Sequence, residues 1–260
     1  MALTLSARGL GFGYPGHRVG HALDLDIGAH QVTMLLGPNG CGKTTLFRTL
    51  LGLLPAQAGA VTLDGMPLSS LSRQEIARRL AYVPQVAEGY FPFSVLDVVL
   101  MGRAPFLGTF EAPGRKDREL AGAALGQLGL DELADRSFSA ISGGQRQLAL
   151  IARALVQAAP VLIMDEPTAN LDYGNQHRIL KRARALASDG RTVVISSHNP
   201  DHALAYADQV VLIKSGTVIA AGPAEETMTA ERLSGMYDMP VAVLEVEDGL
   251  GGRSRRCVPL

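Results

Sequence analysis

The segment "GPNGCGKTT", Gly37 to Thr45, combines residue types and a spacing that suit phosphate binding. It follows the apolar run "QVTMLL" and precedes "LFRTLLGLL", so we predict a strand, a glycine-rich loop and a helix. In such a loop backbone N–H groups face phosphate, Lys43 reaches the β- and γ-phosphates, and the Thr44 hydroxyl binds Mg²⁺. The expected nucleotide contacts are Gly37, Pro38, Asn39, Gly40, Cys41, Gly42, Lys43, Thr44 and Thr45.

Two adjacent carboxylates follow the apolar residues of "VLIMDEP", Val161 to Pro167. A buried strand that ends in a charged turn is common and needs no function. Beside a phosphate loop, however, Asp165 at a strand end is the expected partner of hydrated Mg²⁺, and Glu166 is placed to act as general base on water. The pair therefore favours hydrolysis over simple storage of a nucleotide.

Three further residues are candidate site residues because of their positions relative to the predicted strands. His198 ends "TVVISSH" and Gln85 ends "AYVPQ", so both follow predicted strands at the edge where open α/β sheets bind ligands. A lone histidine is usually structural or exposed, but this position favours a contact with phosphate or water. We expect catalytic roles for both residues, and Mg²⁺ binding by Gln85. Tyr14 is a core or turn residue, or the ring that stacks on adenine.

A second glycine-rich turn lies in "ISGGQRQ", Ile141 to Gln147, directly ahead of a predicted amphipathic helix. A glycine-rich turn at a helix start exposes unpaired N–H groups and the positive end of the helix dipole, and both favour an anion. This turn has no lysine or Mg²⁺-binding carboxylate of its own, so it is half of a phosphate site. Its candidate residues are Ser142, Gly143, Gly144 and Gln145.

The elements that must position these residues follow from the apolar pattern. Residues 2–30 predict short antiparallel strands, and after residue 160 strands and helices alternate, whereas 86–158 is mostly helical. Alternation implies a parallel sheet covered on both faces. The predicted fold class is α/β, a P-loop NTPase (RecA-like) with a mostly parallel core sheet, an N-terminal antiparallel β subdomain and an inserted helical subdomain. We expect one domain over 1–260, with the insertion at 86–158 and a strand-turn-strand extension at 240–260.

Composition excludes several other classes of protein. A net charge of −1 over 260 residues leaves no basic stripe for nucleic acid, and "RSRR" near the end is short enough to be a solvated tail. Cys41 and Cys257 lack metal-ligand spacing, which suits a reducing compartment. The apolar runs are too short to span a bilayer, and the start lacks the features of a secretory signal. We expect a soluble cytoplasmic chain that reaches a membrane only through partners.

The order of Tyr14, "GPNGCGKTT", Gln85, "ISGGQRQ", "VLIMDEPTANLD" and "SSH" resembles the nucleotide-binding subunit of an ATP-binding cassette (ABC) transporter. The resemblance extends to roughly Gly222, and its one departure is Ile141, where that family most often has leucine. It implies an ATPase that uses ATP and Mg²⁺ on the cytoplasmic face of the inner membrane. The implied partners are two transmembrane permease subunits and, indirectly, a periplasmic or lipoprotein substrate-binding protein.

The same resemblance explains why one chain carries two phosphate-binding turns. It implies a homodimer in which subunits pair head to tail and each completes the ATP site of the other. Ser142, Gly144 and Gln145 would then meet the γ-phosphate held by Lys43 of the partner subunit. The segment Asn170, Leu171 and Asp172 resembles the loop that passes between the two sites, and Asp172 is its candidate for nucleotide contact.

The transported substrate class is suggested by "FPFSVLDVVLMGRAPFLG", Phe91 to Gly108, which resembles importers of iron siderophores, haem or cobalamin. We expect the region from Gln85 to Gly108 to dock the membrane partner, although its phenylalanines are equally compatible with ordinary core. Molybdate-type oxyanion importers share the architecture and stay open as an alternative, as does an exporter cassette. A DNA-repair ABC ATPase is disfavoured, because no sustained heptads separate the two glycine-rich turns.

Overall fold

A computed structural model of the protein describes residues 5–85, 92–108, 110–169, 171–247 and 252–260. The chain divides into two compact units: Met1–Ser70 together with Leu180–Leu260, and Leu71–Ile179. The first unit contains an antiparallel sheet and four strands of mostly parallel sheet, and the second unit contains a pair of parallel strands. The boundaries expected for the helical insertion and the C-terminal extension stay predictions.

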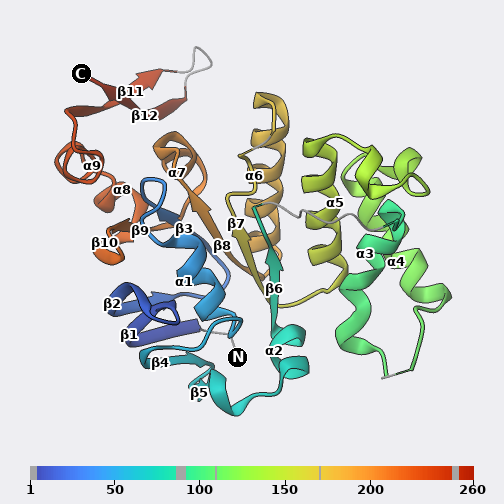
Figure 1. Ribbon diagram of the computed structural model, residues 1–260. Coiled ribbons are helices and arrows are strands. Elements are labelled where there is room, and N and C mark those ends of the chain that lie inside the picture. The colour runs from blue at the N-terminus through green and yellow to red at the C-terminus, as the bar shows by residue number, and fades with distance from the viewer. Residues whose placement is uncertain (1–4, 86–91, 109, 170, 248–251) are drawn as a thin grey trace. The chain divides into compact units, whose positions relative to one another are not determined.

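The antiparallel sheet of the first unit has the strand order β2-β1-β4-β5 (Figure 1). Its strands are β1 (Leu5–Tyr14), β2 (His17–Ile27), β4 (Ala58–Leu63) and β5 (Met66–Pro67). Two residues join β1 to β2, and the second is Gly16 with φ +76°, a value that suits a tight hairpin. The expected antiparallel strands are therefore confirmed, and they are longer than the pattern suggested.

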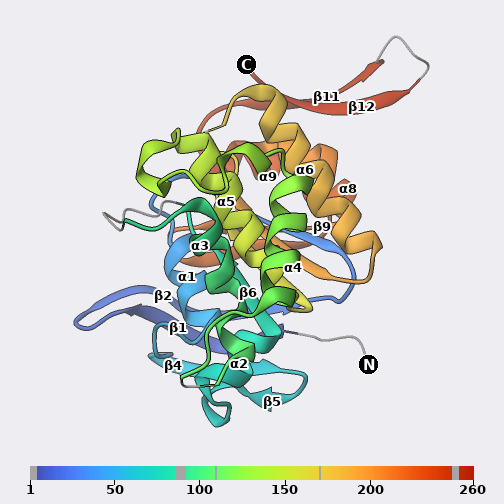
Figure 2. The same ribbon diagram turned by 90° about the vertical axis from the view of Figure 1, so that its right-hand side faces the viewer.

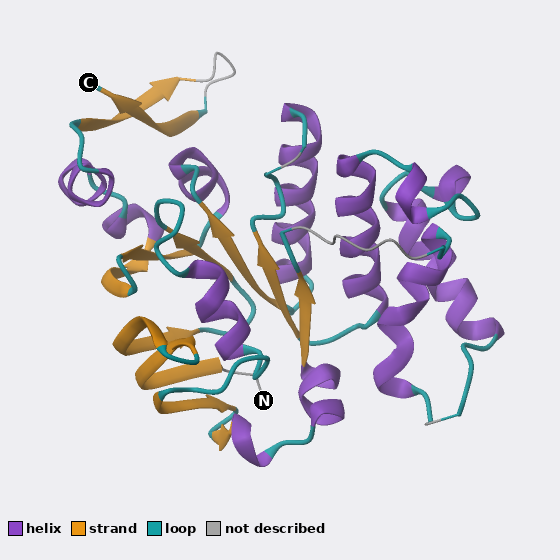
Figure 3. Ribbon diagram, viewed as in Figure 1, coloured by secondary structure: helices purple, strands orange, loops and turns teal. Residues whose placement is uncertain are grey.

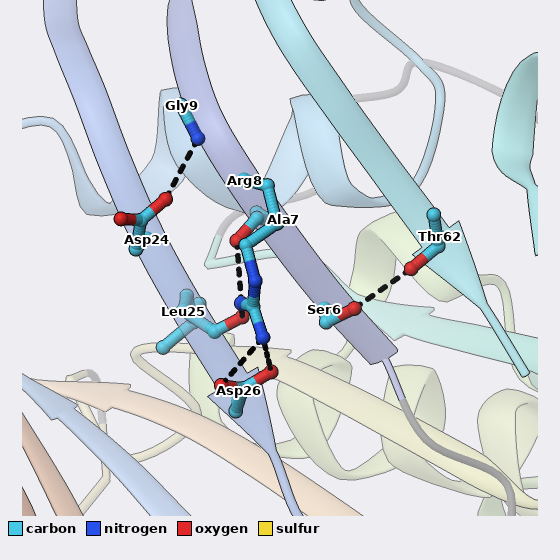
Figure 4. A network of polar contacts seen from close by, with 8 residues as sticks. All are labelled: Ser6, Ala7, Arg8, Gly9, Asp24, Leu25, Asp26 and Thr62. Atoms are coloured by element: carbon cyan, nitrogen blue, oxygen red, sulfur yellow. Dashed lines mark hydrogen bonds and ion pairs between the residues drawn. The ribbon is translucent and has the colours of Figure 1, made fainter. Parts of the chain in front are cut away.

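A polar network fastens β1 to both of its neighbours (Figure 4). The Arg8 guanidinium donates to both carboxylate oxygens of Asp26 at 2.7 and 2.8 Å, and also to the Leu25 carbonyl. On the other side of β1, the Ser6 and Thr62 hydroxyls lie 2.7 Å apart. These contacts connect three strands next to a register shift in β1 after Ala7.

The core strands of the first unit lie in the order β10-β9-β3-β8 (Figure 3). They are β3 (Val32–Leu36), β8 (Thr192–Ser197), β9 (Gln209–Lys214) and β10 (Thr217–Pro223). β3 pairs in parallel with β8 and β9, whereas β10 runs antiparallel to β9. All residues of β3 and β8 are buried, which explains why both strands are almost continuous apolar runs.

Helices and a terminal hairpin complete the first unit. They are α1 (Lys43–Leu50), α7 (Pro200–Tyr206), α8 (Ala224–Thr227), α9 (Ala230–Tyr237), β11 (Val241–Glu247) and β12 (Arg253–Pro259). β11 and β12 pair antiparallel, so the two strands expected near the C-terminus are confirmed. The turn expected between them falls on 248–251, outside the described residues. The sequence analysis missed β10, α8 and α9, because the hydrophobic periodicity of these short elements is weak.

The second unit holds the two remaining core strands and most of the helices. β6 (Leu80–Val83) and β7 (Val161–Asp165) pair in parallel. Helices α3 (Val95–Leu100), α4 (Arg115–Gln127) and α5 (Gly143–Val156) pack against one another (Figure 2), with the 3₁₀ turn Met101–Phe106 between α3 and α4. These three helices confirm a helical insertion between the strands.

Two local predictions about helices are also confirmed. Helix α2 (Arg73–Arg79) begins with the expected capping box, in which the Ser72 hydroxyl accepts from the Glu75 amide and the Glu75 carboxylate accepts from the Ser72 amide. Helix α6 (Tyr173–Ser188) buries the face formed by Ile179, Ala183 and Leu186. Among the described residues, no helix has both the length and the apolar content needed to cross a bilayer.

Candidate active site

The phosphate loop lies between β3 and α1, where the sequence places it. Gly40 and Gly42 have φ of +80° and +104°, values that a residue with a side chain rarely adopts. The Gly42 carbonyl accepts the first hydrogen bond of α1, from the Leu46 amide at 2.9 Å. The Gly37 amide donates to the Ser197 carbonyl at 3.3 Å, so the loop is tied to the end of β8. The loop geometry is thus set by glycines and by the neighbouring strand.

The Lys43 side chain folds back over this loop. Its ammonium donates to the Gly37 carbonyl at 2.7 Å and to the Pro38 carbonyl at 3.1 Å, and the residue is only 5% exposed. A buried ammonium needs such partners, because burial without them is costly. It lies at the first residue of α1, where the helix dipole adds positive potential. Thr44, the candidate Mg²⁺ ligand, is the next residue and is half-buried.

Tyr14 and His198 belong to the same unit as the phosphate loop. The Tyr14 hydroxyl accepts from Arg48 of α1 at 2.9 Å, and the residue is 37% exposed, so it is not a core residue. His198 is exposed and directly follows β8. Leu36 and Ser197 are register partners at the ends of β3 and β8, so the phosphate loop and His198 leave the sheet side by side. The first unit therefore contains the phosphate loop, Tyr14 and His198.

The carboxylate pair and Gln85 come together in the second unit. β6 and β7 are parallel neighbours, so the residues after their carboxyl ends meet at one edge. The Gln85 amide donates to Glu166 Oε2 at 3.5 Å, and the Tyr82 hydroxyl donates to Asp165 Oδ2 at 3.4 Å. Asp165 is fully buried and Glu166 is 8% exposed. Three predicted catalytic or metal-binding residues thus form one cluster.

Glu166 has an unusual backbone, which the sequence analysis did not anticipate. Its φ is +43°, a left-handed conformation that costs a residue with a side chain about 1 kcal/mol or more. Such conformations are concentrated at functional sites, where the surrounding structure compensates for the strain. The left-handed backbone of Glu166 turns the chain after β7. Asp165 is the last residue of that strand and is fully buried, whereas Glu166 lies outside the strand.

The SGGQ turn, Ser142 to Gln145, begins helix α5 with a reciprocal cap. The Ser142 hydroxyl accepts from the Gln145 amide at 3.2 Å, and Gln145 Oε1 accepts from the Ser142 amide at 2.9 Å. The Ser142 proton and the Gln145 side-chain NH₂ can still donate to an anion. The Gly143 and Gly144 amides lie in the first turn of α5, ahead of the Arg146 amide, which donates to the Ser142 carbonyl at 2.9 Å. The spacing S-x-x-Q is itself a capping-box signal, which the sequence analysis did not use here.

Helix α5 also holds the strand end that leads to Gln85. The Gln147 side chain donates to the Pro84 carbonyl at 3.4 Å, and Arg153 donates to the Tyr82 carbonyl at 3.2 Å. Burial lowers the pKa of Arg153, although the guanidinium remains charged at neutral pH. These tertiary contacts carry no local sequence signal. They connect the helix that begins at the SGGQ turn to the segment that carries Gln85.

Asp172 caps the start of helix α6 in this structure. Its carboxylate accepts from the Asn175 amide at 2.9 Å and from the Asn175 side chain at 2.7 Å. These hydrogen bonds lower the pKa of Asp172, so the group stays ionised. Leu171 is buried beside it, and Asn170 lies outside the described residues. Contact of Asp172 with a nucleotide stays a prediction.

The phenylalanines of the expected docking region are partly exposed. Phe93 is 38% and Phe106 is 39% exposed, whereas Phe91 lies outside the described residues. The Phe106 ring packs against the guanidinium of Arg103, 4.3 Å from its centroid. The alternative that these rings are ordinary core therefore does not hold for Phe93 and Phe106.

Comparison with known proteins decides the family. The family model for ABC transporters matches residues 21–169, more than half of the chain. The chain belongs to the ABC transporter family. It is an ATP-binding subunit, an ABC-type ATPase coupled to transport and part of a transporter complex.

Two relatives and one solved structure match this chain over most of its length, and the chain covers most of theirs. The hemin import ATP-binding protein HmuV of Nocardia farcinica is 42% identical over 248 residues, covering 94% of this chain and 85% of that protein. The iron(3+)-hydroxamate import ATP-binding protein FhuC of Bacillus subtilis is 36% identical, covering 93% and 90%. A solved ABC transporter assigned to the metal-chelate type, in an inward-facing conformation, superimposes with a TM-score of 0.87 at 33% identity and covers 99% and 98%.

Gly37→Ala tests the geometry of the phosphate loop. An added Cβ would lie 2.3 Å from the Ile213 carbonyl oxygen and 2.8 Å from Cys41 Sγ. Because a backbone atom must move, we expect a stability loss of about 1–3 kcal/mol and ATP binding weakened about tenfold or more. Calorimetric titration and thermal unfolding measure both effects.

Gly122→Ala is the matched control, because that exposed position in α4 has no heavy atom within 4 Å of the new Cβ. It should leave ATP binding unchanged and raise stability by about 0.5–1 kcal/mol. Wild-type nucleotide affinity in Gly37→Ala would contradict the placement of the loop at the phosphates.

Proposed function

We propose that this ATPase powers import of a metal chelate such as an iron siderophore, haem or cobalamin. The observation that carries the proposal is that near-full-length relatives at 36–42% identity include import ATPases named for hemin and for iron(3+)-hydroxamate. A cobalamin import ATP-binding protein of Halobacterium salinarum, 39% identical over 93% of this chain, supports the same class. A manganese transport ATPase of Listeria innocua at 39% identity makes a free metal ion the second candidate.

The proposed reaction is hydrolysis of ATP. Lys43 and the loop amides would hold the β- and γ-phosphates, and Tyr14 would stack on the adenine. Glu166 would take a proton from the attacking water, while Gln85 orients that water and His198 donates to the γ-phosphate. The order of the motifs along the chain supports these roles, together with the Gln85 and Glu166 contact within one unit.

Mg²⁺ would be held by Thr44, Asp165 and Gln85. Among the described residues, no group of three or more histidine, cysteine or acidic side chains could hold a metal ion alone. That finding fits Mg²⁺, which keeps several waters and binds through one or two carboxylates together with substrate phosphates. The ion would neutralise charge that develops on the phosphates during hydrolysis. The donors of Thr44 and Asp165 are hard oxygens of the kind that Mg²⁺ prefers.

We further propose a head-to-tail homodimer. The SGGQ turn supplies amides, a hydroxyl and a side-chain NH₂, but no lysine. Such a turn can stabilise a γ-phosphate only where another phosphate loop holds the nucleotide. Ser142, Gly143, Gly144 and Gln145 would complete the site of the partner subunit, and Asp172 would lie between the two sites.

The membrane partners would be two permease subunits, with a substrate-binding protein acting through them from outside. Docking is proposed for the region from Gln85 to Gly108, where Phe93 and Phe106 present partly exposed rings. The ATPase would then be peripheral on the cytoplasmic face of the membrane. Because Gln85 begins this region, a shift at the γ-phosphate would reach the permease through few bonds.

Glu166→Gln tests the proposed general base. The amide can still orient water but cannot accept its proton, so we expect hydrolysis to fall by about 10²- to 10⁴-fold while ATP binding persists. The variant should accumulate as an ATP-bound dimer in size-exclusion chromatography. Glu119→Gln, at an exposed ion pair with Arg115, is the matched control and should hydrolyse ATP normally. Turnover of Glu166→Gln near the control value would remove Glu166 from the reaction.

The transported substrate can be tested in the native host with Glu166→Gln at the chromosomal locus. We expect uptake of one labelled chelate, among ferric siderophore, haem and cobalamin, to be lost. Uptake of labelled manganese and molybdate should stay at the wild-type level in the same cells. Loss of manganese or molybdate uptake, with all three chelates unaffected, would refute the proposed substrate class.

A further inference from the structure

Two hydrogen bonds from the C-terminal part of the chain hold the histidine loop, residues 197–201, which runs from the end of β8 into the start of α7. The Tyr237 hydroxyl, at the end of α9, donates to the His198 carbonyl at 2.9 Å. The Cys257 amide, in β12, donates to Asp201 Oδ1 at 2.8 Å. All of these residues belong to one unit, and α7 packs against β12 within it. Segments distant in sequence therefore fix both sides of His198.

Helix α9 is anchored to the core sheet on the side that carries Tyr237. Lys214 of β9 donates to the Gly235 carbonyl at 2.7 Å and pairs with the Asp238 carboxylate at 2.6 Å. Leu233 and Met236 of the helix are almost completely buried. The donor hydroxyl is thus carried by an element attached to β9, which is a direct neighbour of β3 in the sheet. Its position is fixed by the same strands that position the phosphate loop.

The hairpin strand β12 has its own attachment to the unit. Arg255 donates to the Glu225 carbonyl at 3.0 Å and to the Met228 carbonyl at 2.8 Å. Cys257 lies two residues later on the same face of the strand. The amide that reaches Asp201 is therefore held in place independently of the histidine loop.

The histidine loop has internal contacts that transmit these anchors to His198. The Asn199 amide donates to Ser197 Oγ at 3.0 Å, and the Asn199 side chain accepts from the Asp201 amide at 2.9 Å. Ser197 is buried at the end of β8, whereas the His198 residue is exposed. The hydrogen bond from Tyr237 to the His198 carbonyl restrains the peptide between His198 and Asn199. That restraint limits the directions in which the His198 side chain can leave the backbone.

Burial raises the pKa of Tyr237 above its ordinary value. The hydroxyl therefore stays protonated at physiological pH and remains a donor to the carbonyl.

We propose that Tyr237 and the contact between Asp201 and Cys257 are positioning groups for His198, so that helix α9 and the terminal hairpin set the rate of ATP hydrolysis. The proposal rests on the proposed role of His198 at the γ-phosphate. Both groups donate or accept their hydrogen bonds at the histidine loop, so we expect their loss to lower turnover more than nucleotide affinity.

Tyr237→Phe removes one hydroxyl and keeps the half-buried ring. Because one hydrogen bond to a neutral carbonyl is lost, we expect kcat to fall by roughly 3- to 10-fold, with KM for ATP unchanged. Ser254→Ala is the control, since its hydroxyl donates to the Val246 carbonyl within the hairpin. It should leave kcat and KM at the wild-type values. A KM increase in Tyr237→Phe, or an unchanged kcat, would overturn the positioning role.

A double-mutant cycle with His198→Ala separates the two proposals. If Tyr237 acts through the imidazole, adding Tyr237→Phe to His198→Ala should cause no further loss of kcat. Wild-type hydrolysis by His198→Ala would refute the role of His198 in the proposed function. Impaired His198→Ala combined with additive effects in the double variant would refute only the positioning role of Tyr237.

Asp201 offers a second test that does not alter α9. Asp201→Ala removes the acceptor for the Cys257 amide and should lower kcat by roughly the same 3- to 10-fold, again without a change in KM. Asp201→Asn keeps an acceptor oxygen and should restore most of the lost kcat. Equal kcat values for the alanine and asparagine variants would contradict the role of this contact.

Discussion

The fold must hold an ammonium group out of bulk water without neutralising it. Lys43 is almost completely buried and is held by two carbonyl groups of its own loop. Burial of that charge is tolerated because Gly37 and Pro38 present those carbonyls, and because β3 and β8 fix where the loop begins. The stability of the strands and the chemistry of the site therefore depend on the same backbone. Neutral carbonyls can be exchanged for phosphate oxygens when ATP binds, whereas a carboxylate partner would compete with it.

The ABC ATPase divides its chemistry between two kinds of helix start. Helix α1 begins with a lysine and a glycine in a left-handed conformation, so it attracts phosphate by charge as well as by backbone dipoles. Helix α5 begins with an uncharged capping box, so it attracts phosphate only weakly by itself. In the proposed dimer, such a weak anion site would bind phosphate only when the partner subunit already holds a nucleotide, so it is suited to sensing that nucleotide. The contacts from α5 to the strand before Gln85 offer a path from such sensing to the proposed docking region.

Much of this fold could be predicted because its strongest signals are local. β3, β7 and β8 are largely apolar runs, and that pattern alone placed the phosphate loop, Asp165 and His198 at strand ends. The capping box at Ser72 was equally visible from spacing. In contrast, the left-handed backbone of Glu166 results from how the chain must turn after a buried strand, and no residue type signals it. The bond from Tyr237 to His198 joins residues 39 apart in sequence, and only the packing of α9 creates it.

The central claim is that each ATP site needs the phosphate loop of one chain and the SGGQ turn of another. The direct test combines two variants, both carrying Glu166→Gln so that bound ATP is retained: one also has Ser142→Arg, and the other has Lys43→Ala. Head-to-tail pairing gives the mixed dimer one intact site, formed by the loop of the first chain and the turn of the second. We therefore expect neither variant alone to trap ATP in a dimer, and the mixture to trap about one ATP per dimer. Trapping by Ser142→Arg subunits alone, or no gain on mixing, would contradict the shared site.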